Sequence, residues 1–126
     1  KIKSLWPALG VTGTTPESLC YDAMMSNFLQ VSNSDDNYFI NYSDGAPYFS
    51  NDDAYYYGDY AANHCRKIIK GMRNNGVKIL SYFIANYEYR DERRIFEKMY
   101  GEDASFINPN NMMEVAKTMN KMFLSK

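Results

Sequence analysis

Apolar residues follow two patterns along this chain: uninterrupted runs and runs with helical spacing. The uninterrupted runs, at residues 38–42 and 77–85, do not alternate with polar residues. Such runs are typical of parallel strands that lie buried between two layers of helices. A shorter third strand is expected at Ala104–Ile107. Asn41 is the residue in the first run that this pattern does not explain.

Helical spacing separates these runs and predicts a helix before, between and after them. The first helix is expected to begin with Thr15 as N-cap, Pro16 at the first helical position and Glu17 in the first turn. The second is expected to end just before Gly76. In chain order, the residues expected on the buried faces are Leu19, Cys20, Ala23, Met24 and Phe28; Ala61, Cys65, Ile68, Ile69 and Met72; Ile95, Phe96 and Met99; and Met112, Val115, Ala116, Met119 and Phe123.

The alternation of helix and strand predicts an α/β fold with a doubly wound parallel sheet, helices on both faces and right-handed crossovers. The strands at residues 38–42 and 77–84 are expected to be adjacent and parallel. A chain of 126 residues has the size of one domain, and it contains no internal repeat or linker. Residues 1–126 are therefore expected to form a single domain.

The charge of the chain is nearly balanced, with 14 Lys and Arg against 15 Asp and Glu and a formal net charge of -1. This balance lacks the basic surface that binds nucleic acid or an anionic membrane. No apolar run approaches the roughly 18 residues of a membrane-spanning helix, and the N-terminus lacks the blocks of a signal peptide. We therefore expect neither nucleic acid nor a membrane as a partner.

Cys20 and Cys65 both fall on the expected apolar faces of helices. Two cysteines without C-x-x-C spacing argue against a zinc site or a redox pair. They are interpreted as buried free thiols, which favours a reducing compartment and a cytoplasmic location.

The strand at residues 38–42 leads directly to a carboxylate, Asp44, and then to a turn at Gly45 and Pro47. In open α/β sheets, ligands bind at the carboxyl ends of the strands, so Asp44 is placed to hold a ligand. The ligand that suits a carboxylate here is a metal ion. The alternative is an ordinary turn aspartate.

Two motifs carry a resemblance to a known family. Gly13-Thr14-Thr15-Pro16-Glu17 opens a helix, and Ser43-Asp44-Gly45-Ala46-Pro47 follows a strand. With the helix, strand and helix that come after, they resemble the C-terminal two-thirds of a von Willebrand factor A domain. The second motif looks most like intracellular members, such as the A-type domain of cobaltochelatase subunits. The resemblance implies a Rossmann-like fold with a metal-ion-dependent adhesion site, at which Thr15 and Asp44 would bind Mg²⁺.

The sequence departs from the family pattern in one respect, because it contains no D-x-S-x-S motif and residues 1–14 contain no Asp. Either the first strand and its loop lie before Lys1 or on another chain, or the site has lost them. Losing that strand would leave a long apolar edge open to aggregation, which favours the first alternative. We therefore expect the domain to be incomplete at its N-terminus and the missing strand to come from upstream sequence or a partner.

The expected partner is a protein. Mg²⁺ prefers hard oxygen ligands and is bound by few carboxylates, so an Asp or Glu of a partner could complete its coordination. Residues 48–60 are expected to form a loop and are rich in tyrosine, a residue typical of recognition surfaces. Their expected role is a partner-binding rim, and the alternative is aromatic packing against the sheet edge. The candidate contact residues are Tyr48, Phe49, Tyr55, Tyr56 and Tyr57.

An enzyme is not expected, because the chain contains no nucleophile-elbow, P-loop, dinucleotide-binding or H-E-x-x-H motif, and no catalytic residue is assigned. His64 stands alone and is interpreted as a structural or surface histidine. The favoured hypothesis is a protein-binding or scaffolding module. One alternative is a subunit of an ATP-driven chelatase-type assembly, and another is a metal-silent structural domain of a large assembly such as a phage particle.

Overall fold

The computed structural model describes residues 14–30, 37–45, 47–84, 90–108 and 112–124. Its helices are α1 (Glu17–Gln30), α2 (Gly58–Asn74), α3 (Arg90–Tyr100) and α4 (Met112–Leu124), and a 3-10 turn, η3 (Gly101–Asp103), follows α3. Its strands are β1 (Tyr38–Ser43), β2 (Phe49–Ser50), β3 (Tyr55–Tyr56), β4 (Lys78–Ile84) and β5 (Ala104–Ile107). None of these described helices combines the length and apolar character that crossing a membrane requires.

The main sheet has three parallel strands in the order β1-β4-β5. In its register, Tyr38 lies opposite Lys78 and Ser43 lies opposite Phe83. The prediction that the two long apolar runs form adjacent parallel strands is therefore confirmed. β1 lies at an edge, because no other strand of the described residues pairs with its second side.

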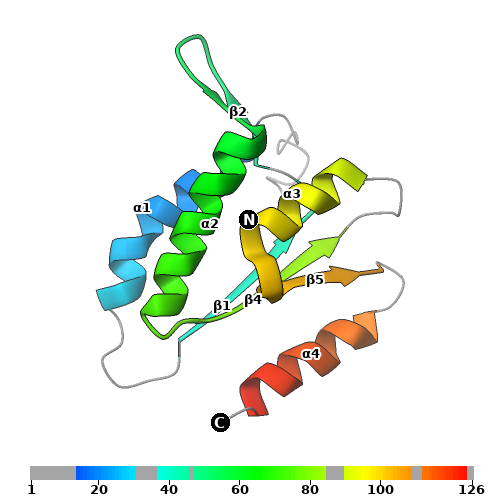
Figure 1. Ribbon diagram of the computed structural model, residues 1–126. Helices are drawn as coiled ribbons and strands as arrows, with labels where there is room; N and C mark the ends of the chain where they lie inside the picture. Colours follow the sequence, from blue (N-terminus) through cyan, green and yellow to red (C-terminus); the bar gives the residue numbers. More distant parts are fainter. Residues whose placement is uncertain (1–13, 31–36, 46, 85–89, 109–111, 125–126) are drawn as a thin grey trace, which may run out of the picture.

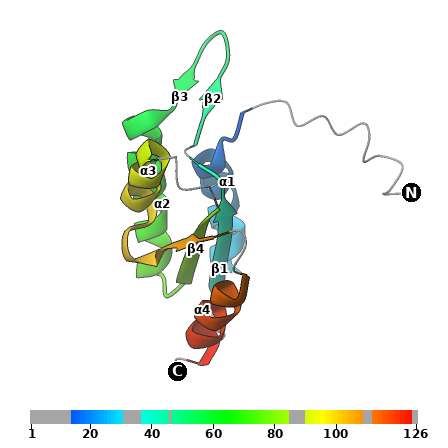
Figure 2. The same cartoon turned by 90° about the vertical axis from the view of Figure 1, so that its right-hand side faces the viewer.

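Helices cover both faces of this sheet (Figure 1). Phe39 and Phe83 belong to a buried cluster with side chains of α1, α2 and α3. The neighbouring strand positions face the other way, so that Ile40 and Tyr82 pack with Val115 of α4. Figure 2 shows α2 and α3 together on one side of the strands. The structure is thus an α/β fold with a parallel sheet flanked by helices.

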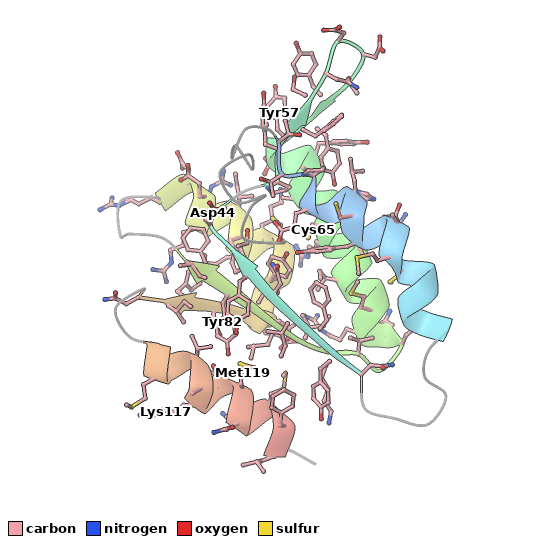
Figure 3. All side chains as sticks on the ribbon, turned by 180° about the vertical axis from the view of Figure 1, so that it is seen from behind. Asp44, Tyr57, Cys65, Tyr82, Lys117 and Met119 are labelled. Carbon is pink, nitrogen blue, oxygen red and sulfur yellow. The ribbon has the colours of Figure 1, made fainter. Side chains whose placement is uncertain are left out.

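Side chains of β4 and α4 also meet through hydrogen bonds. The hydroxyl of Tyr82 lies 3.2 Å from the carbonyl oxygen of Val115 and hydrogen-bonds with the Thr118 hydroxyl. Figure 3 shows Tyr82 and Met119 pointing into the space between the sheet and α4. The ring of Tyr82 stacks on Tyr42 of the edge strand, with centroids 5.1 Å apart. The hydrogen bonds of Tyr82 to Val115 and Thr118 therefore tie α4 to the sheet, even though much of the helix is exposed.

The buried face of α1 differs from the prediction. Leu19, Cys20, Ala23 and Met24 were expected inside, but all four are exposed, and the Phe28 side chain lies outside the described part of the chain. The face turned inward carries Glu17, Ser18 and Tyr21 instead. Periodicity of apolar residues selects the wrong face here, because the buried Glu17 carboxylate accepts hydrogen bonds from Asn41 and Tyr100 in other elements.

The start of α1 also differs slightly. The helix begins at Glu17, so Pro16 rather than Thr15 precedes its first residue, and the first backbone bond runs from the Cys20 amide to the Pro16 carbonyl at 3.0 Å. The carbonyl of Thr15 accepts a hydrogen bond from the Tyr48 amide at 3.0 Å instead. Thr15 therefore joins α1 to the segment that follows β1.

The other helices agree better with the predicted pattern. Every residue assigned to the buried face of α2 is buried, and the helix ends before Gly76, whose φ of 81° suits glycine. In α3, Phe96 and Met99 are buried as expected. In α4 only part of the expected stripe is covered, because Val115 is buried while Ala116 and Phe123 are exposed.

Residues 49–56 form an antiparallel β2–β3 hairpin where the sequence predicted a loop. The side-chain oxygen of Asn51 accepts hydrogen bonds from the amides of Asp53 and Ala54, at 3.1 and 2.7 Å, which closes the turn. Figure 1 shows the hairpin projecting away from the helices and the sheet. The hairpin therefore projects from the rest of the fold, and its turn is held by its own local hydrogen bonds.

Replacing Phe96 by Ala is expected to lower the free energy of unfolding by about 3–5 kcal/mol, because it leaves a cavity in a fully buried site. The Phe96 ring lies 4.6 Å from Tyr100, 5.3 Å from Phe83 and 5.9 Å from Phe106, measured between centroids. Urea unfolding followed by circular dichroism would measure the change. The control is Tyr55→Ala at the exposed hairpin, which should stay within about 0.5 kcal/mol of the parent. Equal losses for the two variants would contradict this view of the core.

Candidate functional site

A pocket of about 270 Å³ opens at the carboxyl end of β1, where the start of α1 meets the turn that follows the strand. The strand contributes residues from its last positions and α1 contributes residues from its first turns. Its polar lining consists mainly of Thr15, Glu17, Tyr21, Asn41, Ser43 and Asp44. The carboxyl end of a parallel strand is the usual place for a ligand in an open α/β sheet. This pocket is therefore the candidate site.

The two predicted metal-binding residues, Thr15 and Asp44, both line this pocket. They come from different elements, since Thr15 precedes α1 and Asp44 follows β1. Both residues are exposed. Figure 3 shows Asp44 at the tip of β1, at the end of the molecule from which the hairpin projects. The structure thus brings the two residues to one accessible place.

A buried carboxylate, that of Glu17, forms the floor of the site. Glu17 is 8 % exposed. Its Oε1 accepts hydrogen bonds from the Tyr21 hydroxyl at 2.5 Å, the Tyr100 hydroxyl at 2.6 Å and the Asn41 side-chain amide at 2.7 Å. A charged acceptor with several donors forms strong hydrogen bonds, which offsets the cost of burying it. The cluster joins α1, β1 and α3 at one oxygen atom.

Asn41 therefore has the explanation that the sequence pattern lacked. Its amide nitrogen donates to Glu17 and also lies 2.9 Å from the hydroxyl of Tyr100. The polar residue in the apolar strand was the available sequence signal for a buried polar partner. It could not identify that partner, because Glu17 and Tyr100 lie 24 and 59 residues away along the chain.

The second oxygen of Glu17 reaches the turn that carries Asp44. Its Oε2 accepts a hydrogen bond from the Ser43 hydroxyl at 3.3 Å. The Ser43 hydroxyl also lies 3.2 Å from the Gly45 carbonyl oxygen and 3.4 Å from the Gly45 amide. Asp44 thus lies between Ser43, which carries this hydroxyl, and Gly45, which the hydroxyl contacts.

Burial raises the pKa of the tyrosines in this cluster. For Tyr21, burial is the largest cause of the raised pKa, and the negative charge of Glu17 adds to it. For Tyr100, burial is again the largest cause, and the negative charge of Glu17 adds to it. Both hydroxyls therefore keep their protons at neutral pH and act as donors to the carboxylate.

The two cysteines differ, contrary to the expectation that both are buried. Cys65 is buried in the core, and burial raises the pKa of its thiol to about 12. Cys20 is exposed and lines the candidate pocket. The prediction was wrong for Cys20, because the face of α1 that turns inward is the polar one.

The oxygen donors of the pocket fit Mg²⁺ in type but form an incomplete ligand set. Thr15 offers a hydroxyl and Asp44 a carboxylate, both hard ligands that Mg²⁺ accepts. The carboxylate of Glu17 is already engaged by its donors. Within the described residues, no group of at least three His, Cys, Asp or Glu side chains is arranged to hold a metal. Any cation here would depend on water and on further ligands.

The tyrosine-rich segment is partly exposed and partly buried. Tyr48, Tyr55 and Tyr57 are exposed. The ring centroid of Tyr57 lies 6.4 Å from that of Tyr48 and 6.5 Å from that of Tyr55. Tyr56 is only 6 % exposed, which favours the alternative role of aromatic packing for its ring. Phe49 is half-buried. The segment therefore combines surface and packing roles.

His64 has a structural role in this segment. The hydroxyl of Tyr56 lies 2.5 Å from Nδ1 of His64, and the two rings meet edge-on with centroids 5.7 Å apart. The pair fixes the base of the hairpin to α2. Burial raises the pKa of Tyr56, in keeping with its position in this contact.

A larger pocket, of about 570 Å³, lies between the C-terminal parts of α2 and α3. Arg66, Lys70 and Arg73 line it. Arg73 pairs with Asp103 and lies 3.7 Å from Glu102. Basic side chains are favourable near the C-terminus of a helix, which carries a partial negative charge. Of these residues, Arg73 lies in the last turn of α2, so the helix terminus and its acidic partners explain it without a ligand.

Alkaline pH is expected to destabilise the fold through the buried tyrosines. The pKa of Tyr21 and of Tyr100 is raised in the folded state, while the unfolded chain titrates near its ordinary value of about 10. Their stabilising contribution is complete below about pH 10 and is lost as the pH rises further, by about 1.4 kcal/mol per pH unit for each group. Urea unfolding at several pH values would measure this slope. Tyr21→Phe should reduce it, whereas Tyr60→Phe on the exposed surface should not.

Thiol labelling should distinguish the two cysteines. In the native protein, Ellman's reagent is expected to modify exposed Cys20 and to leave buried Cys65 intact, and both should react in urea. A native protein in which both thiols react at the same rate would contradict the burial of Cys65. Cys20→Ser provides the control, because it should abolish native labelling.

The site therefore combines an accessible pocket, a carboxylate at the end of a parallel strand and a buried polar floor. These features favour the binding of a ligand at the sheet edge. Comparison of the chain with protein-family models, with curated proteins and with solved structures found no match.

Proposed function

We propose that this chain forms a protein-binding module of the von Willebrand factor A type. Its contact site is the pocket at the carboxyl end of β1, where Thr15 and Asp44 would hold a Mg²⁺ ion. The observation that carries the proposal is that these two residues, from separate elements, line the same accessible pocket. An oxygen-lined pocket at the end of a parallel strand suits a hard cation.

Each residue has a defined part in this function. The Asp44 carboxylate supplies negative charge, and the Thr15 hydroxyl supplies a neutral oxygen. A bound Mg²⁺ would supply a positive centre with a coordination position for an Asp or Glu of the partner. No covalent bond is made or broken in this function, so the module acts by binding rather than by catalysis. Its proposed location is the cytoplasm.

Tyr48, Tyr55 and Tyr57 are proposed to form the rim that contacts the same partner. Their exposed rings lie on a segment attached to the site, since the Tyr48 amide donates to the Thr15 carbonyl at 3.0 Å. Tyrosine rings offer broad contact area at a small cost in side-chain entropy. The rim would therefore add affinity and selectivity to an ion-mediated contact.

The finer fold is also part of the proposal. We propose a doubly wound sheet in which upstream sequence or another chain adds a strand beside β1, which is an edge strand among the described residues. β1 has six residues and pairs only with β4 among the described strands, and an edge strand of this kind is a template for an added strand. Such a strand would also bring further metal ligands to the end of β1.

A second candidate function is a structural domain of a larger assembly that binds no metal. The ligand set in the described residues is small, which favours this alternative. The exposed tyrosines and the edge of β1 would then serve as the assembly contacts. This candidate predicts no response to divalent cations.

Metal binding is tested with Mn²⁺, a paramagnetic substitute for Mg²⁺, added to the ¹⁵N-labelled protein. Amide signals near Thr15 and Asp44 should broaden, and excess Mg²⁺ should restore them. Asp44→Asn is expected to lower the affinity by more than about tenfold, because it removes the proposed charged ligand. Asp53→Asn makes the same change in charge at the hairpin turn and should bind as the parent does. Broadening that is equal in the parent and in Asp44→Asn would eliminate the metal site and leave the structural domain.

A further inference from the structure

We infer that Glu17 is a positioning residue, whose buried carboxylate holds the turn carrying Asp44 in place against the start of α1. The inference rests on the proposed function where it concerns metal affinity. Its structural part, the ordering of the turn, stands on the hydrogen bonds alone.

The carboxylate is anchored from several elements. Tyr21 donates from the next turn of α1, Asn41 donates from β1, and Tyr100 donates from the end of α3, all to Oε1 at 2.5 to 2.7 Å. An ionised carboxylate has lone pairs for all these donors and needs no proton of its own. The hydroxyls of Tyr21 and Tyr100 also lie 3.0 Å apart, on the same side of the carboxylate oxygen that accepts from both. The position of Oε1 is thus determined by three parts of the fold.

The other oxygen transmits this fixed position to the turn. Oε2 accepts from the Ser43 hydroxyl at 3.3 Å, and the same hydroxyl contacts both the amide and the carbonyl of Gly45. Asp44 lies between these two residues. At the other end, Glu17 follows Thr15 by two positions at the start of α1. The Glu17 side chain therefore sets the separation between Thr15 and Asp44, two of the residues that line the pocket.

A purely structural role for the cluster makes a different prediction. If Glu17 only fastened α1 to β1 and α3, the link through Oε2 to Ser43 would be dispensable, because the three donors to Oε1 would remain. If Glu17 positions Asp44, the Ser43 link matters even when overall stability does not change. Groups that orient metal ligands typically contribute tenfold to a hundredfold to metal affinity, roughly the size of the expected effect.

Ser43→Ala is the first variant, because it removes the link to Glu17, together with the contacts of the same hydroxyl to Gly45, and leaves the donors to Oε1 intact. Glu17→Gln leaves the contacts to Gly45 in place, so a loss of order that both variants share is due to the link with Glu17. Order parameters from ¹⁵N relaxation are expected to fall at Asp44 and Gly45, and Mn²⁺ affinity to fall about tenfold. The midpoint of thermal unfolding should move by less than about 5 °C, because the hydrogen bonds that are lost are only partly buried. Ser105→Ala, a serine in β5 away from the pocket, is the matched control and should change none of these values.

Glu17→Gln tests the anchor itself. It keeps the size of the side chain but replaces one oxygen by an amide nitrogen, so it cannot accept from every donor. The turn is expected to lose order as in Ser43→Ala, with a larger fall in Mn²⁺ affinity and a lower thermal midpoint. If this variant does not fold, unchanged order at Asp44 and Gly45 in Ser43→Ala would still overturn the positioning role.

The outcomes separate this inference from the proposed function. Unchanged order at Asp44 and Gly45 in Ser43→Ala would overturn the positioning role, whether or not metal binds. Loss of order in both Ser43→Ala and Glu17→Gln, in a protein whose parent form binds no Mn²⁺, would support the positioning role and overturn the metal site. Loss of both order and affinity in the two variants, with Ser105→Ala unchanged, would support both.

Discussion

The hydrogen bonds that satisfy the Glu17 carboxylate are the constraint on which the rest of this structure depends. Removing a charge from water is costly unless donors replace the lost hydration. Here the donors come from α1, β1 and α3, so the cost is offset only when all three elements occupy their native positions. A polar cluster of this kind stabilises one arrangement of the helices, whereas apolar packing alone is compatible with several.

Much of the sheet could be predicted from the sequence because its signal is local. Uninterrupted apolar runs indicate buried parallel strands, and β1, β4 and β5 lie within a residue or two of the expected bounds. The buried face of α2 could be predicted equally well, since its apolar side chains repeat with the period of the helix. In the candidate site, Asp44 was predicted from its place at the end of a strand and Thr15 from the family resemblance, and both line the pocket.

What could not be predicted depends on partners distant in the sequence. The inward face of α1 carries Glu17 and Tyr21, and only the fold supplies the Tyr100 hydroxyl that makes their burial favourable. Apolar periodicity therefore selected the opposite face of that helix. The hairpin was missed for a related reason, because its strands are two residues each and depend on the turn closed by Asn51. Tyr56 could not be separated from its exposed neighbours without the contact to His64.

The projecting hairpin has a consequence for how this protein can diversify. Its base is fastened by the Tyr56–His64 contact and by the bridge from Thr15 to Tyr48, while its turn is closed by its own hydrogen bonds. Residues between these attachments contribute little to the core, so substitutions and insertions there leave folding nearly unaffected. Selection can therefore change the contacts made by the hairpin independently of the fold, much as interchangeable loops are carried on a constant scaffold.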